Sequence, residues 1–193
     1  AMVRLLDIQI EQISYEDLHK DGARLALVDV QPPYFEKPLG RVDLVVDHHP
    51  KRIAFKARFA DLRSNYGATS TIFTEYLRAA GMEPSQRLAT ALVYGIKTDT
   101  LFLERGSNLA DLSAFNFLYP IANKAMISRI ERPALPREDL EAMGRALSRL
   151  QVENGVAVIH LGEINREDVI PQLAEFCLQI EGVDWSVVSG LVK

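Results

Sequence analysis

The first third of the chain alternates short apolar runs with turn residues. Residues 24–28 and 42–46 are rich in Val and Leu, and each run is followed by an acid and then by proline. Short apolar runs bounded in this way are typical of buried strands in a parallel sheet. Residues 52–59 alternate apolar and basic side chains, which predicts a half-exposed edge strand.

Helical spacing follows. Apolar stripes predict helices over about 70–80 and 84–98, and helical pattern continues over 108–150 with breaks at its prolines. The pattern then returns to a strand at 155–161, a helix that Asn165 can cap, and a strand at 185–192. We therefore predict an α/β protein: a parallel-sheet domain over 1–107, a helical connector over 108–150, and the start of a smaller α/β lobe over 151–193.

The composition limits the classes of protein to which this chain can belong. Lys and Arg number 22 against 26 Asp and Glu, so bulk positive charge does not bind this chain to nucleic acid. The single cysteine, Cys177, excludes an internal disulfide, and we expect it to be a small buried apolar side chain in a cytoplasmic protein. No apolar run approaches the roughly 18 residues that span a membrane. Ala1 before Met2 and the apolar end at Lys193 indicate a piece of a longer protein.

Acids and imidazoles fall at the ends of the predicted elements. Asp29 ends one strand, Asp47-His48-His49 ends the next, and Asp99 ends an apolar helix near the negative pole of its dipole. In open α/β sheets, ligands bind beyond the carboxyl ends of the strands. Carboxylates with an imidazole are ligands for Mn²⁺ or Mg²⁺, which activate water against phosphorus. Taken singly, Asp29 and Asp99 also fit turn or cap residues. Because neighbouring strand residues diverge, at most one of the two histidines should bind a given ion.

The segment 51–63 carries five cations and one acid, Asp61. These cations could steer a polyanion toward the site, but we favour a basic edge strand that resists aggregation. No phosphate-binding loop, dinucleotide fingerprint or cysteine zinc cluster is present in the sequence.

Three motifs resemble the DHH phosphoesterase superfamily, which includes RecJ-like exonucleases, nanoRNA and pAp phosphatases, cyclic-dinucleotide phosphodiesterases and family II pyrophosphatases. Residues 45–50 (Val-Val-Asp-His-His-Pro) match the name-giving motif, 26–29 match the strand-borne aspartate before it, and 95–100 (Gly-Ile-Lys-Thr-Asp-Thr) match the family's helix end. The small residues 67–70 stand where the family begins a helix. The resemblance covers about 24–150, and the last 40 or so residues resemble the start of the DHHA1 domain.

This resemblance implies metal ligation by Asp29, His48 and Asp99, with two Mn²⁺ or Mg²⁺ ions in the intact protein. It also implies that Asp47 orients the histidines and that His49 contacts the scissile phosphate. The chain departs from the family at both ends, because the family's first aspartate cluster and its glycine-rich substrate loop are not in this sequence. We therefore expect weak metal binding and little hydrolysis from this chain as it stands.

Two classes of function remain. The first is a metal-dependent phosphoesterase that acts on pAp, short RNA or cyclic dinucleotides, with polyphosphate or pyrophosphate as the alternative. The second is a non-catalytic module of the same fold that senses a nucleotide. Binding of single-stranded nucleic acid and formation of a homodimer are left open, and no membrane partner is expected.

Overall fold

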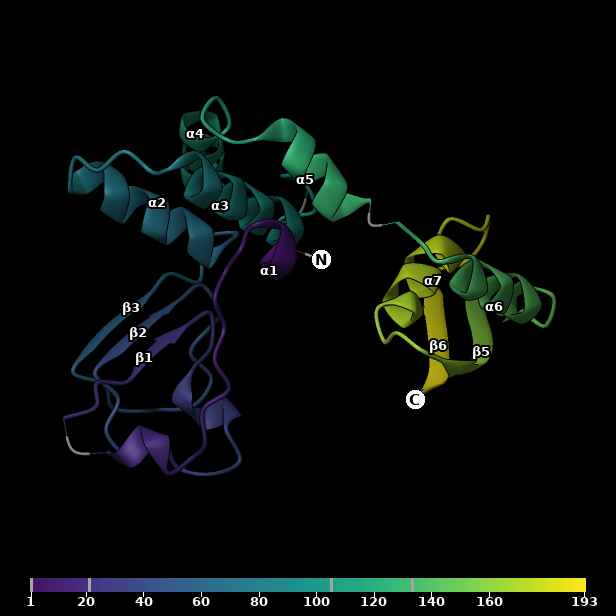
Figure 1. The fold of residues 1–193 in the computed structure, drawn as a ribbon, viewed down its shortest axis with the longest axis horizontal. Coiled ribbons are helices and arrows are strands. Elements are labelled where there is room, and N and C mark those ends of the chain that lie inside the picture. The colour runs from purple at the N-terminus through teal and green to yellow at the C-terminus, as the bar shows by residue number, and fades with distance from the viewer. Residues whose placement is uncertain (1, 21, 105, 133) are drawn as a thin grey trace. The chain divides into compact units, whose positions relative to one another are not determined.

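The computed structural model describes residues 2–20, 22–104, 106–132 and 134–193. It divides into two compact units, Ala1–Arg132 (unit 1) and Pro133–Lys193 (unit 2) (Figure 1). The division therefore lies inside the predicted connector 108–150 and not at its end. The physical reason is that the connector's helices pack in different places, the first two on the helices of unit 1 and the third on the sheet of unit 2.

Unit 1 contains a three-stranded parallel sheet, as predicted. Its strands β1 (Ala26–Val28), β2 (Leu44–Asp47) and β3 (Phe59–Leu62) lie in the order β1-β2-β3. Val45 and Val46 of the central strand are fully buried, which explains the continuous apolar run there. Because the three strands are parallel, their carboxyl ends all lie at one edge of the sheet.

The predicted edge strand at 52–59 is wrong, because β3 begins only at Phe59. Residues 48–58 instead return the chain from the carboxyl end of β2 to the amino end of β3, which every parallel pair requires. Phe55 and Ala57 pack half-buried against the cluster of Leu27, Leu39, Val42 and Val45. The alternation at 52–59 thus arises where alternate side chains, Phe55 and Ala57, contact the core, although most of the segment does not pair with a strand.

Helices α2–α5 lie together as a group beside these strands (Figure 1). The helical elements of unit 1 are α1 (Met2–Leu5), η1 (Asp17–His19), η2 (Pro32–Tyr34), α2 (Thr69–Ala79), α3 (Gln86–Asp99), α4 (Leu109–Leu118) and α5 (Lys124–Glu131). Side chains cap α3, α4 and α5 at Ser85, Asn108 and Asn123. Buried residues of α3, α4 and α5 form the second core cluster, which includes Val93, Ile96 and Leu118.

Helices α2 and α3 approach each other very closely at Gly95. A Cβ atom built at Gly95 would overlap the Ser70 Oγ and lie 3.3 Å from the Ser70 Cβ, so glycine at position 95 allows the helices to pack this closely without a shift of Ser70. Asp99 follows Gly95 by about one helical turn, and Thr69 precedes Ser70. The close contact therefore brings the start of α2 and the end of α3 to one place.

Unit 2 is a βαβ unit with an added hairpin. The parallel strands β5 (Val156–Ile164) and β6 (Trp185–Val192) are joined through α7 (Val169–Cys177), which confirms the predicted order. The short strand β4 (Gln151–Glu153) was not predicted, and it pairs antiparallel with β5. The turn between them is Asn154-Gly155, with φ of 50° and 79°, as a two-residue hairpin of type I′ needs.

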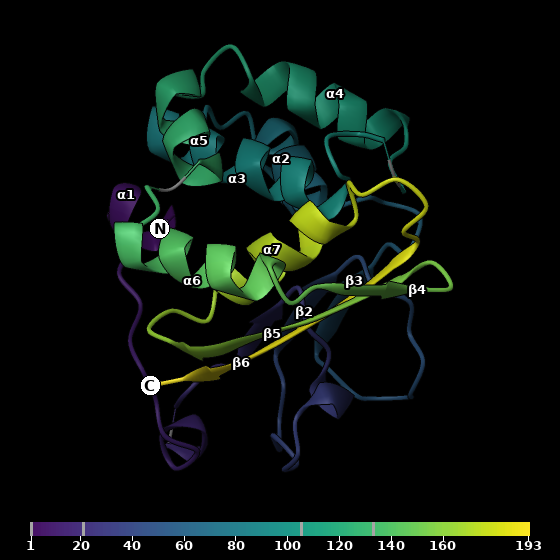
Figure 2. The same ribbon diagram turned by 90° about the vertical axis from the view of Figure 1, so that its right-hand side faces the viewer.

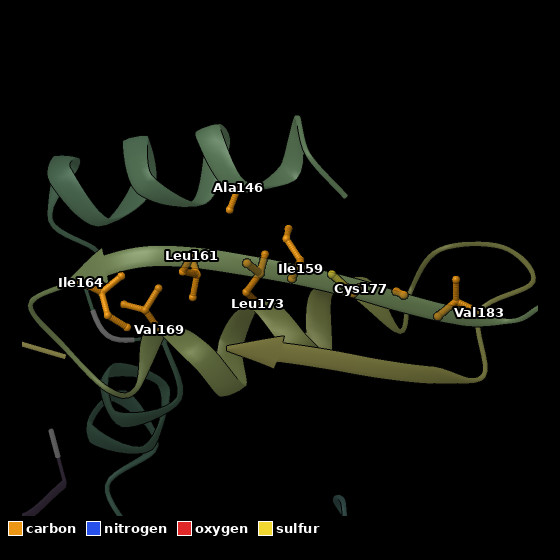
Figure 3. Packing of buried hydrophobic residues seen from close by; sticks show 9 residues of the cluster. Ala146, Ile159, Leu161, Ile164, Val169, Leu173, Cys177 and Val183 are labelled. Carbon is orange, nitrogen blue, oxygen red and sulfur yellow. The ribbon is translucent and has the colours of Figure 1, made fainter. Parts of the chain in front are cut away.

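One face of the unit 2 sheet is covered by α6 (Arg137–Leu147) and α7, which lie on the same side of β5 and β6 (Figure 2). Figure 3 shows the resulting core, in which side chains of α6, β5 and α7 meet. Cys177 is fully buried in this core, as predicted. Asn165 does not occupy the cap position of α7, which belongs to Asp168. Within the described ranges, no helix has the length and apolar character to cross a membrane.

Arg63 joins the end of β3 to helix α2. Its guanidinium donates to both oxygens of Asp61, at 2.8–3.1 Å, to the Tyr66 hydroxyl at 3.1 Å and to Glu75. The Tyr76 hydroxyl also donates to Asp61, at 2.5 Å. Arg63, one of the five cations of segment 51–63, is thus a structural residue, whereas the other four are exposed: Lys51, Arg52, Lys56 and Arg58.

This cluster predicts a loss of stability in alkali. Burial and the hydrogen bond to Asp61 raise the pKa of Tyr76 to about 12, so the folded chain keeps this proton longer than the unfolded chain. The stabilisation is complete below about pH 10 and is lost as the pH rises toward about 12. Tyr76→Phe should lower the free energy of unfolding by about 1 kcal/mol at pH 8. This difference should shrink above pH 10, as measured by urea unfolding at several pH values.

Tyr34→Phe is the matched control, because the Tyr34 side chain is 61% exposed. It should change neither the stability at pH 8 nor its alkaline slope. A Tyr76→Phe difference that stays constant from pH 8 to pH 12 would contradict the assignment.

Candidate metal centre

Asp29 follows β1 directly and is held in an unusual backbone conformation. Its φ is +62°, in the left-handed region that non-glycine residues seldom occupy. Residues in such conformations are frequent at functional sites. The Asp29 N–H donates to the Val46 carbonyl at 3.0 Å, which continues the ladder between β1 and β2 by one residue. Its carboxylate Oδ1 accepts a hydrogen bond from the Thr69 hydroxyl at 2.8 Å. Strand pairing and helix α2 together thus fix this carboxylate.

His48 lies between two carboxylates. Its Nε2 is 3.5 Å from Asp29 Oδ1 and 4.0 Å from Asp99 Oδ2. Its Nδ1 lies 3.2 Å from the Tyr66 carbonyl oxygen, which can only accept, so Nδ1 carries the proton when the imidazole is neutral. The backbone N–H of His48 donates to the Thr69 Oγ1 at 3.2 Å. Nε2 is therefore left with a lone pair that faces the two acids.

Asp99 is the last residue of α3, and its side chain is 33% exposed. Burial and the negative charge of Asp29 raise the pKa of its carboxyl, against the opposing effect of His48 and His49. The negative end of the helix dipole adds to this penalty. Residues 101–103, just beyond α3, all have positive φ, so the turn after this acid is strained as well. Without a cation, the position is unfavourable for a charged carboxylate.

Asp47 is fully buried and holds His49. Its Oδ1 accepts from the His49 Nδ1 at 2.7 Å and from the His49 N–H at 3.2 Å, and its Oδ2 accepts from the Gln31 amide at 2.7 Å. Burial alone would raise the pKa of Asp47, but the hydrogen bonds from Gln31 and His49 outweigh it and the pKa is lowered. Asp47 thus orients His49 and leaves His48 to the Tyr66 carbonyl, whereas the resemblance implied that it orients both rings.

The two histidine rings lie side by side, with centroids 4.3 Å apart and planes tilted by 54°. The expectation that neighbouring side chains diverge is not met, because β2 ends at Asp47 and its alternation ends there too. The ring nitrogens nevertheless differ in their partners. His49 Nδ1 is bonded to Asp47 and lies 4.0 Å from Asp29, so Asp29, His48 and His49 form a compact group of three candidate ligands.

The donor set fits a divalent cation. Two ligand atoms about 2.1 Å from one ion lie roughly 3.0–4.2 Å apart, depending on the angle between them. The distances from His48 Nε2 to Asp29 and Asp99 fall in this range. A metal-bound histidine also usually donates its other N–H to a carbonyl or carboxylate, as His48 does to Tyr66. Asp29 and Asp99, predicted from separate stretches of sequence, thus each lie within ligand distance of His48, whereas the compact group of three is Asp29, His48 and His49.

Two supporting residues were not predicted as part of the site. Thr69 bridges Asp29 and the His48 backbone, and Gln31 joins Asp47 to the His49 carbonyl, at 3.0 Å from the latter. The exposed fraction of Gln31 is only 1%, although it follows a strand and precedes two prolines. A polar residue at such a turn is a weak signal, and its partners lie 16–18 residues away in the sequence.

Comparison with known proteins supports this fold. No family model matches the chain. It is 33% identical over 195 residues to the uncharacterized protein MJ1633 of Methanocaldococcus jannaschii, a match that covers all of this chain and 40% of that protein. It is 31% identical over 140 residues to the A-adding tRNA nucleotidyltransferase of Aquifex aeolicus, which covers 70% of this chain and 17% of that enzyme. The chain therefore spans less than half the length of the curated relatives it matches.

Two solved structures share the architecture. An exopolyphosphatase-related protein from Bacteroides fragilis matches with a TM-score of 0.59 and 20% identity, over 74% of this chain and 45% of that one. A putative family II inorganic pyrophosphatase from Methanococcus jannaschii matches with a TM-score of 0.54 and 16% identity, over 99% of this chain and 70% of that one. The class that these likenesses define is an α/β fold. Within it, the similarity is to exopolyphosphatase-like and pyrophosphatase-like structures.

The arrangement of acids predicts that Asp99→Asn stabilises the metal-free chain. Near pH 7 it should raise the free energy of unfolding by about 0.3–1 kcal/mol, because it removes a charge at a helix C-terminus beside Asp29. The raised pKa of Asp99 sets the sign: the penalty exists above that pKa and disappears as the pH falls through it, so the gain should vanish in acid. The same change should weaken Mn²⁺ binding, measured by calorimetry.

Asp7→Asn is a suitable control, because the Asp7 side chain is 79% exposed in the same unit. It should leave both quantities near their wild-type values. An Asp99→Asn variant that is less stable than wild type at pH 7 would show that this acid is not under electrostatic strain.

Proposed function

We propose that this chain belongs to a cytoplasmic, metal-dependent phosphohydrolase that cleaves phosphoester or phosphoanhydride bonds. The observation that carries the proposal is the position of His48, whose Nε2 faces Asp29 and Asp99 while its Nδ1 is bonded to the Tyr66 carbonyl. An imidazole lone pair between two carboxylates is a ligand set for Mn²⁺ or Mg²⁺. The likeness of fold to structures named as exopolyphosphatase-related and family II pyrophosphatase agrees with this chemistry.

Each residue then has a role in the reaction. Asp29, His48 and Asp99 would hold the ion, and Thr69 would keep the first two in register. A divalent ion there supplies positive charge to the phosphoryl oxygens and lowers the pKa of water. His49 keeps Nε2 for the substrate, because its Nδ1 is bonded to Asp47. The buried Asp47 carboxylate would stabilise the protonated imidazolium of His49. From this form, Nε2 would donate a proton to a phosphate oxygen.

We propose small nucleotides or short oligonucleotides, such as pAp, cyclic dinucleotides or short RNA, as the first class of substrate. Phosphoanhydrides are the second candidate, because the names of both structural neighbours refer to polyphosphate or pyrophosphate hydrolysis. Both classes carry several negative charges, and the exposed cations Lys51, Arg52, Lys56 and Arg58 lie on the segment that follows His49. The alternative function is a non-catalytic module that senses a nucleotide. The same four cations would then bind the phosphates of that nucleotide.

The test is Mn²⁺-dependent phosphate or nucleotide release by the complete gene product. The panel contains pAp, a short RNA, a cyclic dinucleotide, pyrophosphate and tripolyphosphate, each with and without a chelator. Chelator-sensitive cleavage of any member supports the hydrolase, and the preferred member defines the substrate class. Tight nucleotide binding with no cleavage of any member would favour the sensor.

His48→Ala should reduce metal-dependent hydrolysis by roughly 100-fold or more, because it removes the central ligand of the proposed site. The circular dichroism spectrum should remain that of the wild type, since the His48 side chain is not part of either core cluster of unit 1. His160→Ala is the matched control, because His160 is an exposed residue of unit 2. Activity that survives His48→Ala would show that the ligand assignment is wrong.

A further inference from the structure

The carbonyl that holds His48 belongs to a peptide unit with a second strong contact. The unit joins Tyr66 to Gly67: its C=O faces the His48 Nδ1 at 3.2 Å, and its N–H donates to the Asp111 Oδ2 at 2.9 Å. Peptide units are planar, and in a trans unit the C=O and N–H point in opposite directions. The direction of the N–H therefore fixes the direction of the C=O. Asp111 and His48 bind opposite sides of one rigid group.

Asp111 is a fully buried carboxylate whose hydrogen bonds are all made within the fold. Besides Gly67, it accepts from the Asn108 N–H at 2.8 Å and from the Thr71 hydroxyl at 2.5 Å. Asn108 and Asp111 form the capping box of α4, and Thr71 lies in α2. A capping box alone does not need burial, and a buried charge is costly unless its bonds are strong. The hydrogen bond from Gly67 lies outside the capping box.

The fit between this peptide and Asp111 is tight. A Cβ atom built at Gly67 would lie 2.5 Å from the Thr100 Cγ2, 3.0 Å from the Asp111 Oδ2 and 3.1 Å from the Gly106 carbonyl oxygen. Only glycine permits this approach, because a side chain at position 67 would collide with Asp111 and with the Gly106 carbonyl. A carboxylate also accepts hydrogen bonds more strongly than a neutral group, and hydrogen bonds in series polarise one another.

We propose that Asp111 is a positioning residue for the metal centre and acts on His48 through the Tyr66–Gly67 peptide. The carboxylate holds the peptide N–H, the peptide carbonyl holds the His48 proton on Nδ1, and Nε2 keeps its lone pair toward Asp29 and Asp99. Metal-bound histidines often donate their second N–H directly to a carboxylate, which fixes the tautomer. Here a peptide unit lies between the histidine and the carboxylate. Its relevance to metal binding rests on the proposed function, but its effect on the tautomer of His48 does not.

The experiment measures the tautomer of His48 in the metal-free chain by long-range ¹H–¹⁵N correlation. The spectra are recorded at about pH 8.5, well above the ordinary imidazole pKa of about 6.5. The wild type should show His48 with the proton on Nδ1. In Asp111→Ala, the peptide is released and a substantial Nε2–H population should appear. The Mn²⁺ affinity should fall about 10–100-fold, as is usual when such support is lost.

Two controls separate positioning from general stability. Thr71→Val removes another hydrogen bond to Asp111, and Asn123→Ala removes the cap of α5. Both should lower the unfolding temperature without changing the tautomer of His48. Asp111→Asn keeps an acceptor for Gly67 but loses the charge, so its Nε2–H population should lie between those of the wild type and Asp111→Ala. If Asp111→Ala does not fold, Asp111→Asn decides.

The outcomes are distinct. A wild-type His48 protonated on Nε2, or a folded Asp111 variant with an unchanged tautomer, would overturn the relay. A tautomer that follows Asp111 while the Mn²⁺ affinity stays unchanged would support the relay and argue against His48 as a ligand of the proposed metal site. A tautomer that shifts equally in Asn123→Ala would show that any loss of stability has this effect, and would overturn the specific role of Asp111.

Discussion

The parallel pairing of β1 with β2 is the constraint on which the candidate site depends. The register sets Leu27 opposite Val45 and Val28 opposite Val46, and the Asp29 N–H closes the ladder on the Val46 carbonyl. Both strands therefore end at the same level. A shift of one residue in β1 would turn the buried Leu27 to the exposed face of the sheet, so burial of Leu27 helps to hold the register. In this register the acid after β1 and the triplet at the end of β2 lie at the same edge of the sheet.

Polar links then convert this alignment into a defined geometry. Thr69 at the start of α2 contacts Asp29 and the backbone of His48, so the helix and both strand ends are tied through one hydroxyl. Helix α3 is placed against α2 by the glycine contact at Gly95, and it delivers Asp99 from the other side. Three segments that are far apart in sequence thus contribute one acceptor each around His48. None of them could be moved alone without loss of a core contact or a buried hydrogen bond.

The sequence was sufficient for the elements whose signal is local. The apolar runs predicted β1 and β2, and the polar residues at their ends predicted Asp29 and the triplet 47–49. The supporting network could not be predicted, because Thr69 and Asp111 reach partners 21–44 residues away, and the local signals at both positions indicate only the start of a helix. The segment 52–59 was misassigned because half-burial produces alternation with or without a strand. The hairpin at Asn154-Gly155 carried a local signal, but β4 is only three residues long.

The left-handed backbone at Asp29 has a consequence for how this protein changes over generations. The left-handed conformation is strained for most residues. The nearby Asp99 is a carboxylate that burial and the charge of Asp29 destabilise. Laboratory evolution for heat resistance alone, with no demand on chemistry, would therefore find its easiest improvements at these two acids. Lineages that retain both while their surroundings drift would reveal, from sequence data only, that something other than robustness is under selection.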